Sequence, residues 1–173
     1  MTDTLPPERR SWNMGRIRSQ HTKPELIIRS LLHRTGFRFR ISNRTLPGSP
    51  DIVLPKYKTV IFVHGCFWHR HENCAKARMP NSNQDYWQQK FARNMARDAA
   101  AVKDLESQGW RVLVLWECDI LRDPLAALER LIKDMEEDQE PQQYAVGLER
   151  SQILQLAEKK SRYLNPKSPS RVA

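Results

Sequence analysis

The spacing of hydrophobic residues along the chain predicts a mixed α/β domain. Hydrophobic side chains recur every three or four positions in residues 22–36, 84–107 and 124–135, as they do on the buried face of a helix. Runs rich in β-branched and aromatic residues at 37–41, 51–54, 59–63 and 111–116 predict strands instead. The predicted order is therefore α-β-β-β-α-β, followed by a final helix. Residues 51–63 should form an antiparallel hairpin, and the following strand–helix–strand unit should bring its two strands parallel.

Cap and turn residues indicate where these elements end. Thr22 and Glu25 have the spacing of a capping box at the start of the first helix, and Gly36 is placed to end that helix. Gly109 ends the 84–107 helix in the same way. The hydrophobic positions of that helix, which we expect to face the core, are Trp87, Phe91, Met95, Val102 and Leu105.

Length and composition limit the class of protein. The 173 residues predict one domain at 22–140, preceded by an arm at 1–21 and followed by a partly disordered basic extension at 141–173. No hydrophobic run approaches the ~18 residues of a membrane span, and no signal peptide is recognisable. Three cysteines, an odd number, are typical of a protein from a reducing compartment, so we expect a cytoplasmic location.

Positive charge is spread unevenly along the chain. The net charge is +9, with +7 in residues 1–50, +4 in 51–100, −6 in 101–150 and +4 in 151–173. Clustered Arg and Lys neutralise phosphates, so the first half predicts a surface for a polyanion, with nucleic acid the first candidate. A basic surface that serves solubility alone is the alternative.

The three cysteines and a histidine predict a metal site. Cys66, His71 and Cys74 are spaced C-x4-H-x2-C directly after the 59–63 strand, and Cys118 follows the 111–116 strand. Three thiolates and one imidazole make the closed tetrahedral set of a structural zinc site. Two alternatives stay open at this point: the cysteines can be buried core thiols, and His69 can replace His71 as the ligand.

An acid and two histidines near the same strand ends predict a second site. Asp51 starts one strand of the hairpin and His64 ends the other, so an acid, backbone carbonyls and a histidine should meet there. Magnesium favours such oxygen ligands together with substrate phosphate. Asp51 would anchor the ion, Glu25 would orient water, and His64 or His69 can act as general base. Plain turn chemistry for Asp51 and helix capping for Glu25 are the alternatives.

Hydrophobic side chains beside arginines suggest contact with DNA bases. Phe67 and Trp68 lie in the polar loop that carries the cysteines, so we expect an exposed pair that stacks on or between bases; packing into the core is the alternative. Residues 11–21 interleave hydrophobic and basic side chains and are expected to be an arm that orders on DNA, or else a short amphipathic helix. The residues of this arm that we assign to DNA binding are Met14, Arg16, Ile17 and Arg18.

Four ordered blocks of sequence resemble the very short patch repair endonucleases. The blocks are NMGRIRSQHTKPE at 13–25, LPGSPD at 46–51, VIFVHGCFWH at 60–69 and GWRVLVLWEC at 109–118. The resemblance implies a restriction-endonuclease-like PD-(D/E)xK core with a structural zinc. It also implies that duplex DNA is nicked 5′ to the thymine of T:G mismatches, which arise when 5-methylcytosine deaminates.

The resemblance also assigns roles to residues. It implies that Asp51 and the Val63 carbonyl bind magnesium, that His69 is the general base, and that His64 and Glu25 support them. The zinc ligands would be Cys66, His71, Cys74 and Cys118, the aromatic wedge Phe67, Trp68 and Trp87, and the residues of the arm that close on the other groove Met14 and Ile17.

Two departures and several partners complete these expectations. Val63 stands where the family has threonine, and the lysine of the ordinary nuclease core is absent, with His64 in its region.

The implied setting is the bacterial cytoplasm at the nucleoid, with a monomer that works beside a cytosine-5 DNA methyltransferase and a repair polymerase. The rival functions are a restriction-type endonuclease that cuts both strands and a non-catalytic, zinc-stabilised DNA-binding module.

Overall fold

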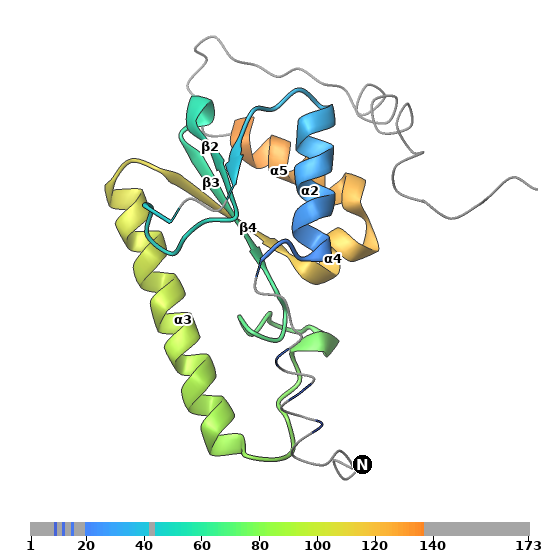
Figure 1. Ribbon diagram of the computed structural model, residues 1–173, viewed down its shortest axis with the longest axis vertical. Helices are drawn as coiled ribbons and strands as arrows, with labels where there is room; N and C mark the ends of the chain where they lie inside the picture. The colour runs from blue at the N-terminus through green and yellow to red at the C-terminus, as the bar shows by residue number, and fades with distance from the viewer. Residues whose placement is uncertain (1–8, 10–11, 13–14, 16–19, 42–43, 137–173) are drawn as a thin grey trace, which may run out of the picture.

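A four-stranded sheet with helices on both faces forms the body of the protein (Figure 1). The structure, a computed structural model, describes residues 9, 12, 15, 20–41 and 44–136. Its helices are α2 (Lys23–Arg34), α3 (Gln84–Ser107), α4 (Glu117–Arg122) and α5 (Pro124–Glu136). Its strands are β1 (Arg40–Ile41), β2 (Ile52–Leu54), β3 (Thr59–His64) and β4 (Arg111–Trp116).

The strands lie in the order β1-β2-β3-β4. Strands β1 and β2, and β2 and β3, pair antiparallel, with Val53 opposite Val60 across the hairpin. Strand β4 pairs parallel to β3, with Leu115 opposite Val63. The predicted hairpin and the predicted parallel pair are both confirmed, and the expectation of a mixed α/β fold with helices around a sheet is correct.

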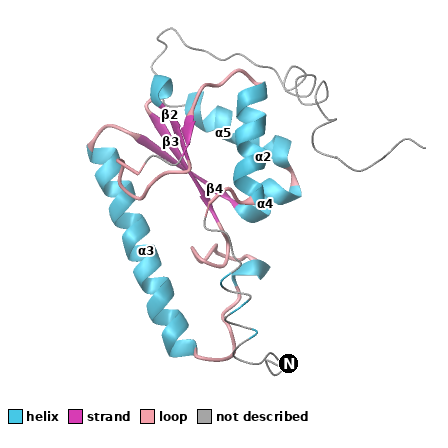
Figure 2. Ribbon diagram, viewed as in Figure 1, coloured by secondary structure: helices cyan, strands magenta, loops and turns pink. Residues whose placement is uncertain are grey.

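Each face of the sheet is covered by different helices (Figure 2). Ile52 and Ile61 belong to the larger hydrophobic core, which includes residues of α2, α4 and α5. Val60 and Phe62, which alternate with Ile61 along β3, pack instead with Leu105 of α3. Burial on both faces explains why the central strands are hydrophobic throughout rather than at every second position.

Three details differ from the sequence prediction. The strand expected at 37–41 pairs only at Arg40–Ile41, where it forms a short sheet edge. Helix α4 was not predicted, because six residues are too few to show a helical period. Met95 was expected to face the core, but its side chain is 53% exposed and Asn94 points inward instead.

The loop before β2 is held close to α3 by a glycine. Gly48 has a φ of +69°, and a Cβ atom there would lie 2.8 Å from the Cβ atom of Ala101 and 3.0 Å from the Phe62 ring. A larger residue would therefore push the loop off both β3 and α3. Because Asp51 lies at the end of this loop, the close approach fixes where its carboxylate sits.

The described helices include none that is both long and hydrophobic enough to cross a membrane. The expected arm and C-terminal extension fall largely outside the described residues, so their boundaries stay predictions.

Candidate active site and metal centre

A cleft of about 1570 Å³ opens between the start of α2, the end of β3 and the inner face of α3. It gathers side chains from segments that are far apart in sequence. The titratable residues that line it are His21, Glu25, Asp51, His64, His69, Asp98 and Glu117, and its basic residues are Lys23, Arg44 and Arg97.

Asp51 is half-buried at the mouth of the hairpin. The Val63 N–H donates a hydrogen bond of 2.7 Å to Asp51 Oδ2, which joins the acid to β3. The pKa of Asp51 is raised from 3.8 to about 6, mainly by burial and also by the negative charge of Glu25. The Val63 hydrogen bond and the positive charges of Arg29 and His69 act in the opposite direction. A carboxylate that is costly to ionise and faces a cleft is a typical place for a cation.

The two histidines predicted near Asp51 lie against each other. The rings of His64 and His69 stack with centroids 3.8 Å apart and an angle of 10° between their planes. Burial, followed by the charge of His69, lowers the pKa of His64 to about 4. His64 is therefore neutral at pH 7 and a weak base, so the geometry favours His69 for proton transfer.

Asp98 on α3 orients His69, and the sequence analysis missed it. His69 Nδ1 lies 2.5 Å from Asp98 Oδ2, and Arg97 donates a hydrogen bond of 3.3 Å to Asp98 Oδ1. When Nδ1 carries the proton, the Nε2 lone pair of His69 is left to accept one. The sequence did contain a signal for this role, because Asp98 continues a series of inward-facing residues on α3 that lie four, three and four positions apart. The series begins with Trp87, Phe91 and Asn94.

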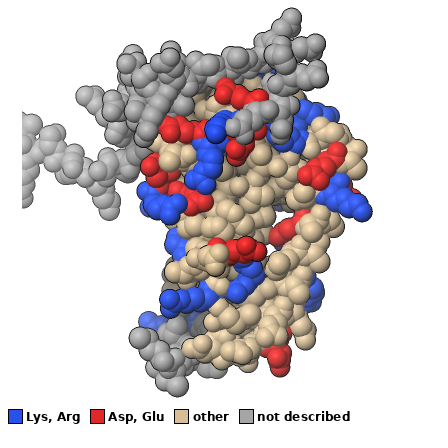
Figure 3. Space-filling view, turned by 180° about the vertical axis from the view of Figure 1, so that it is seen from behind, with Lys and Arg blue, Asp and Glu red and all other residues tan. Residues whose placement is uncertain are grey.

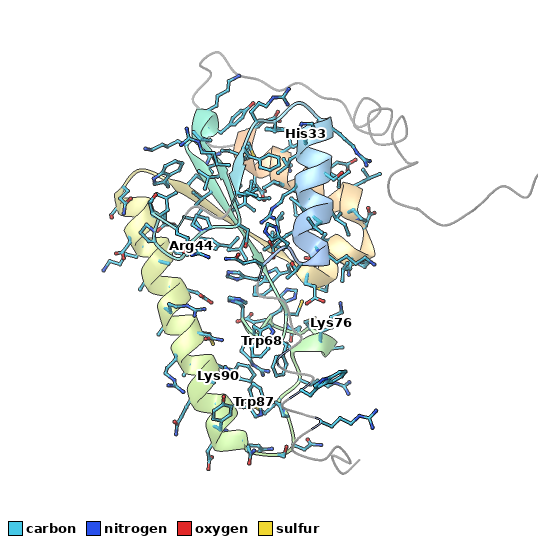
Figure 4. All side chains as sticks on the ribbon, viewed as in Figure 1. His33, Arg44, Trp68, Lys76, Trp87 and Lys90 are labelled. Atoms are coloured by element: carbon cyan, nitrogen blue, oxygen red, sulfur yellow. The ribbon has the colours of Figure 1, made fainter. Side chains whose placement is uncertain are left out.

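Glu25 both caps α2 and lines the cleft. Its carboxylate accepts hydrogen bonds from the Thr22 N–H (3.2 Å) and the His21 N–H (3.0 Å), so the predicted capping box is present. Glu25 is only 3% exposed and forms an ion pair of 2.8 Å with Arg29. The capping and functional interpretations of Glu25 therefore do not exclude each other. His21 also lines the cleft, whereas His33 is exposed at the far end of α2 (Figure 4).

The four predicted zinc ligands converge beside the cleft. Ligand atoms of Cys66, His71, Cys74 and Cys118 all lie within 4.8 Å of one another. His71 Nδ1 is 3.2 Å from the Cys118 sulfur and 3.7 Å from the Cys66 sulfur. The ring of Trp116 stacks on the His71 ring at 4.1 Å. Three thiols and an imidazole at these distances fit a tetrahedral zinc ion. Burial raises the pKa of the Cys66 thiol, so its thiolate form needs a nearby cation to be stable.

The aromatic residues of the loop pack on α3, so the expectation of an exposed pair was wrong. Phe67 and Trp68 are half-buried, and the Phe67 ring lies 5.1 Å from Trp68, 5.3 Å from Trp87 and 5.2 Å from Phe91. We call these four residues the aromatic cluster. Lys90 lies over its Trp68 ring at 5.4 Å, on the side of α3 that faces the loop (Figure 4). The loop was polar enough to suggest exposure, but α3 supplies the covering surface.

Acidic and basic side chains both line the cleft, and both also occur on the face turned away from Figure 1. Arg44 and Arg97 line the cleft, and Lys90 lies beside it. On the face turned away from Figure 1, the described acidic and basic side chains are interspersed around a broad uncharged area (Figure 3). The residues Met14, Arg16, Ile17 and Arg18, assigned to DNA binding from the sequence, lie outside the described residues.

Comparison with known proteins gives matches over most of the chain. A family model described as DNA mismatch endonuclease Vsr matches residues 2–76. The chain is 47% identical over 135 residues to the type II nicking enzyme V.XorIIP of Xanthomonas oryzae, a match that covers 78% of this chain and 97% of that protein. It is 45% identical over 139 residues to the type II nicking enzyme V.NmeAIP of Neisseria meningitidis, covering 78% of this chain and 99% of that protein. It is 38% identical over 137 residues to the DNA mismatch endonuclease Vsr of Escherichia coli, a match that covers 79% of this chain and 87% of that protein.

Proposed function

The chain belongs to the family of the DNA mismatch endonuclease Vsr, and on this premise we propose that it nicks one strand of duplex DNA 5′ to the thymine of a T:G mismatch. Such mismatches arise when 5-methylcytosine deaminates, so the nick would start very short patch repair. The observation that carries the proposal is the meeting of Asp51 with the His69–Asp98 pair in one cleft, beside an aromatic cluster that can reach a base pair.

Asp51 and the Val63 carbonyl would hold a magnesium ion in this cleft. The donors fit, because a carboxylate and a peptide oxygen are the hard ligands that magnesium prefers. When bound, magnesium polarises the phosphodiester and stabilises the leaving oxyanion. The hydrogen bond from the Val63 N–H holds Oδ2 of Asp51, so the carboxylate is oriented before any ion arrives. Replacement of the family threonine by Val63 leaves this peptide oxygen in place.

His69 would take the proton of the attacking water. Asp98 fixes the ring through Nδ1 and so presents Nε2 as the acceptor. His64, which is neutral because its pKa is about 4, stacks on His69 and limits its rotation. Glu25 adds a buried acid near Asp51 and orients water. This division of roles gives the proton to His69 rather than to His64.

The aromatic cluster would serve as the wedge that reads the mismatch. Phe67 already contacts Trp68 and Trp87 edge to face, and Trp68 lies tilted against Trp87, so insertion between bases would exchange these contacts for contacts with DNA. A T:G pair is easier to part than a matched pair, so the exchange favours mismatched sites. Met14 and Ile17 would close from the other groove, with Arg16 and Arg18 on phosphates.

A zinc ion on Cys66, His71, Cys74 and Cys118 would fix the loop that carries the wedge. Cys66 lies one residue before Phe67, and Cys118 lies on α4, so the ion would join the loop to the body of the protein. The role is structural, because four protein ligands leave no open position. The loop would then keep its shape while its aromatic side chains change partners.

The wider setting follows from the same family. We propose a PD-(D/E)xK nuclease core at 22–140, a DNA-contacting arm at 1–21 and a basic extension at 141–173. The enzyme would act as a monomer in the bacterial cytoplasm, at the nucleoid. It would follow a cytosine-5 DNA methyltransferase, which creates the 5-methylcytosine, and it would precede a repair polymerase.

The names of two relatives favour a single-strand cut. V.XorIIP and V.NmeAIP are both called type II nicking enzymes. A nick fits repair of one mispaired base better than the double-strand cut of a restriction-type endonuclease.

The test compares duplexes labelled separately on each strand. Matched and T:G-mismatched duplexes of the same sequence are incubated with the protein, with magnesium or with a chelator. A magnesium-dependent nick only in the thymine strand of the mismatch supports the proposal. Cleavage of both strands of matched DNA would favour the restriction-type alternative, and binding without any cut would favour a non-catalytic module.

A further inference from the structure

A buried arginine joins two of the acids that line the cleft. Arg29, on α2, is 7% exposed. Its Nη2 atom donates hydrogen bonds to Glu25 Oε2 at 2.8 Å and to the Asp51 carbonyl oxygen at 3.1 Å. One nitrogen therefore links the carboxylate of Glu25, on the first turn of α2, to the backbone of Asp51 at the start of β2. Such a link fixes two segments that no strand pairing holds together.

The other end of the guanidinium reaches the junction with the arm. Arg29 Nη1 lies 2.9 Å from Nδ1 of His21, whose backbone N–H also donates to Glu25. His21 has a φ of +54°, a left-handed conformation that a histidine seldom adopts. Glu25 and Arg29 thus both contact this strained position, and Arg29 also holds the Asp51 peptide.

Charge pairing alone does not account for this arrangement. An Arg four residues after a Glu is an ordinary helix-surface pair, and such pairs are usually exposed. Here both partners are buried, and Nε of Arg29 has no hydrogen-bond partner among the described residues. A buried N–H without a partner costs free energy. We infer that the contacts of the other two guanidinium nitrogens compensate for this cost.

We propose that Arg29 is a positioning residue for the Asp51–Glu25 pair. Its Nη2 atom holds the Asp51 backbone and the Glu25 carboxylate in fixed relative places, while its Nη1 atom contacts His21. The inference rests on the proposed function, since it concerns the acid that would hold magnesium. Groups that orient metal-binding carboxylates typically change metal affinity or activity about 10- to 100-fold when removed.

Two substitutions separate positioning from simple charge balance. Arg29→Lys keeps a buried positive charge for Glu25, but an ammonium lacks the planar fork needed to reach both Asp51 and His21. Arg29→Met removes the charge as well. Arg38→Met is the matched control, because Arg38 is exposed and lies outside the cleft. Each protein is tested for thermal unfolding, binding to T:G duplex in chelator, and nicking rate against magnesium concentration.

A second readout avoids turnover. The melting temperature of the DNA-free protein is measured as magnesium increases, because an ion that binds the folded state raises it. For Arg29→Lys we expect a folded protein with unchanged mismatch binding in chelator. We expect its half-saturating magnesium concentration to rise about tenfold in both the nicking and the melting series. Arg38→Met should match the wild type in both series.

The outcomes distinguish failure of the proposed function from failure of the role of Arg29. If the wild type does not nick T:G duplexes, the proposed function fails. If the wild type nicks and Arg29→Lys shows the wild-type magnesium dependence, only the role of Arg29 fails, because its charge alone was sufficient. Loss of folding in both Arg29 variants would also overturn the proposal, since it would assign Arg29 to the stability of the fold.

Discussion

Replacing Asp51 with asparagine should abolish nicking and at the same time stabilise the metal-free protein. Burial makes the charged form of Asp51 unfavourable, so its pKa rises from 3.8 to about 6 in the folded state. Above pH 6 the folded protein holds a charge that the unfolded chain holds at no such cost. Asparagine keeps the shape and can still accept the hydrogen bond from the Val63 N–H, but it carries no charge.

The size of the effect follows from the two pKa values. At 1.36 kcal/mol per pH unit, the difference corresponds to about 3 kcal/mol in the free energy of unfolding. Asp51 is only half-buried, so water screens part of this cost, and we expect a gain of about 1 to 3 kcal/mol. For a chain of this length the melting temperature should rise by roughly 3 to 10 °C.

The difference in melting temperature between wild type and Asp51→Asn should depend on pH. Near pH 4 Asp51 is protonated in the folded state, so wild type and Asp51→Asn should melt at similar temperatures. The gap should open as the pH rises from about 4, the unfolded pKa, to about 6, the folded pKa, and stay nearly constant above about 7. Thermal unfolding at pH 4.5, 6 and 8, with zinc present and magnesium absent, measures this gap. Asp104→Asn, an exposed site on α3, is the control and should change little at any pH.

Magnesium should reverse the order of stability. An ion on Asp51 stabilises only the wild type, so its melting temperature should approach or pass that of Asp51→Asn as magnesium increases. If Asp51→Asn melts below the wild type at pH 8 without magnesium, the carboxylate is not destabilising and the reasoning from burial is wrong. Full nicking activity in Asp51→Asn would remove Asp51 from the mechanism.

Three further substitutions test other parts of the site. Asp98→Asn should lower the single-turnover nicking rate about 100-fold or more without changing mismatch binding, because His69 loses the carboxylate that orients it; an unchanged rate would exclude this role. Cys118→Ser should lower the bound zinc measured by metal analysis and lower the melting temperature, and wild-type zinc content would contradict the assignment. Trp68→Ala should reduce the preference for T:G over matched duplex about tenfold in binding titrations, and an equal loss on both duplexes would refute the wedge.

The sequence predicted best those features that local signals determine. The bounds of α3 and β4 agree with the prediction, because a long helical period and a short hydrophobic run directly after a helix-ending glycine are readable without tertiary information. The cluster of three cysteines and one histidine was predicted for a similar reason, since these residue types are few in the chain. Helix α4 was missed because it is a single short segment between a strand and a proline.

The features that the sequence did not predict depend on contacts between segments that are distant in the chain. Asp98 looks like one more polar residue on a long helix until α3 is placed beside His69. Arg29 looks like a surface partner of Glu25 until β2 brings Asp51 against it. The choice between His69 and His71 beside the cysteines was open in the sequence, and the structure brings His71 to two of the sulfurs and His69 to Asp98. The half-burial of Phe67 likewise requires α3.

The cleft and the predicted metal loop, residues 66–74, concentrate features that cost stability. Among the described residues, six other than glycine have positive φ angles, and four of them lie in these two places: His21 and Ser49 line the cleft, and Arg70 and Asn73 lie in the metal loop. The unpaired Nε of Arg29 and the costly charge of Asp51 occur in the same region. Strain of this kind persists where surrounding contacts or bound ions compensate for it. We therefore expect the hydrophobic core on the α2 and α5 side to carry most of the stability of the domain and the cleft side to depend on bound cations, so that removing metal loosens the cleft and loop before it unfolds the core.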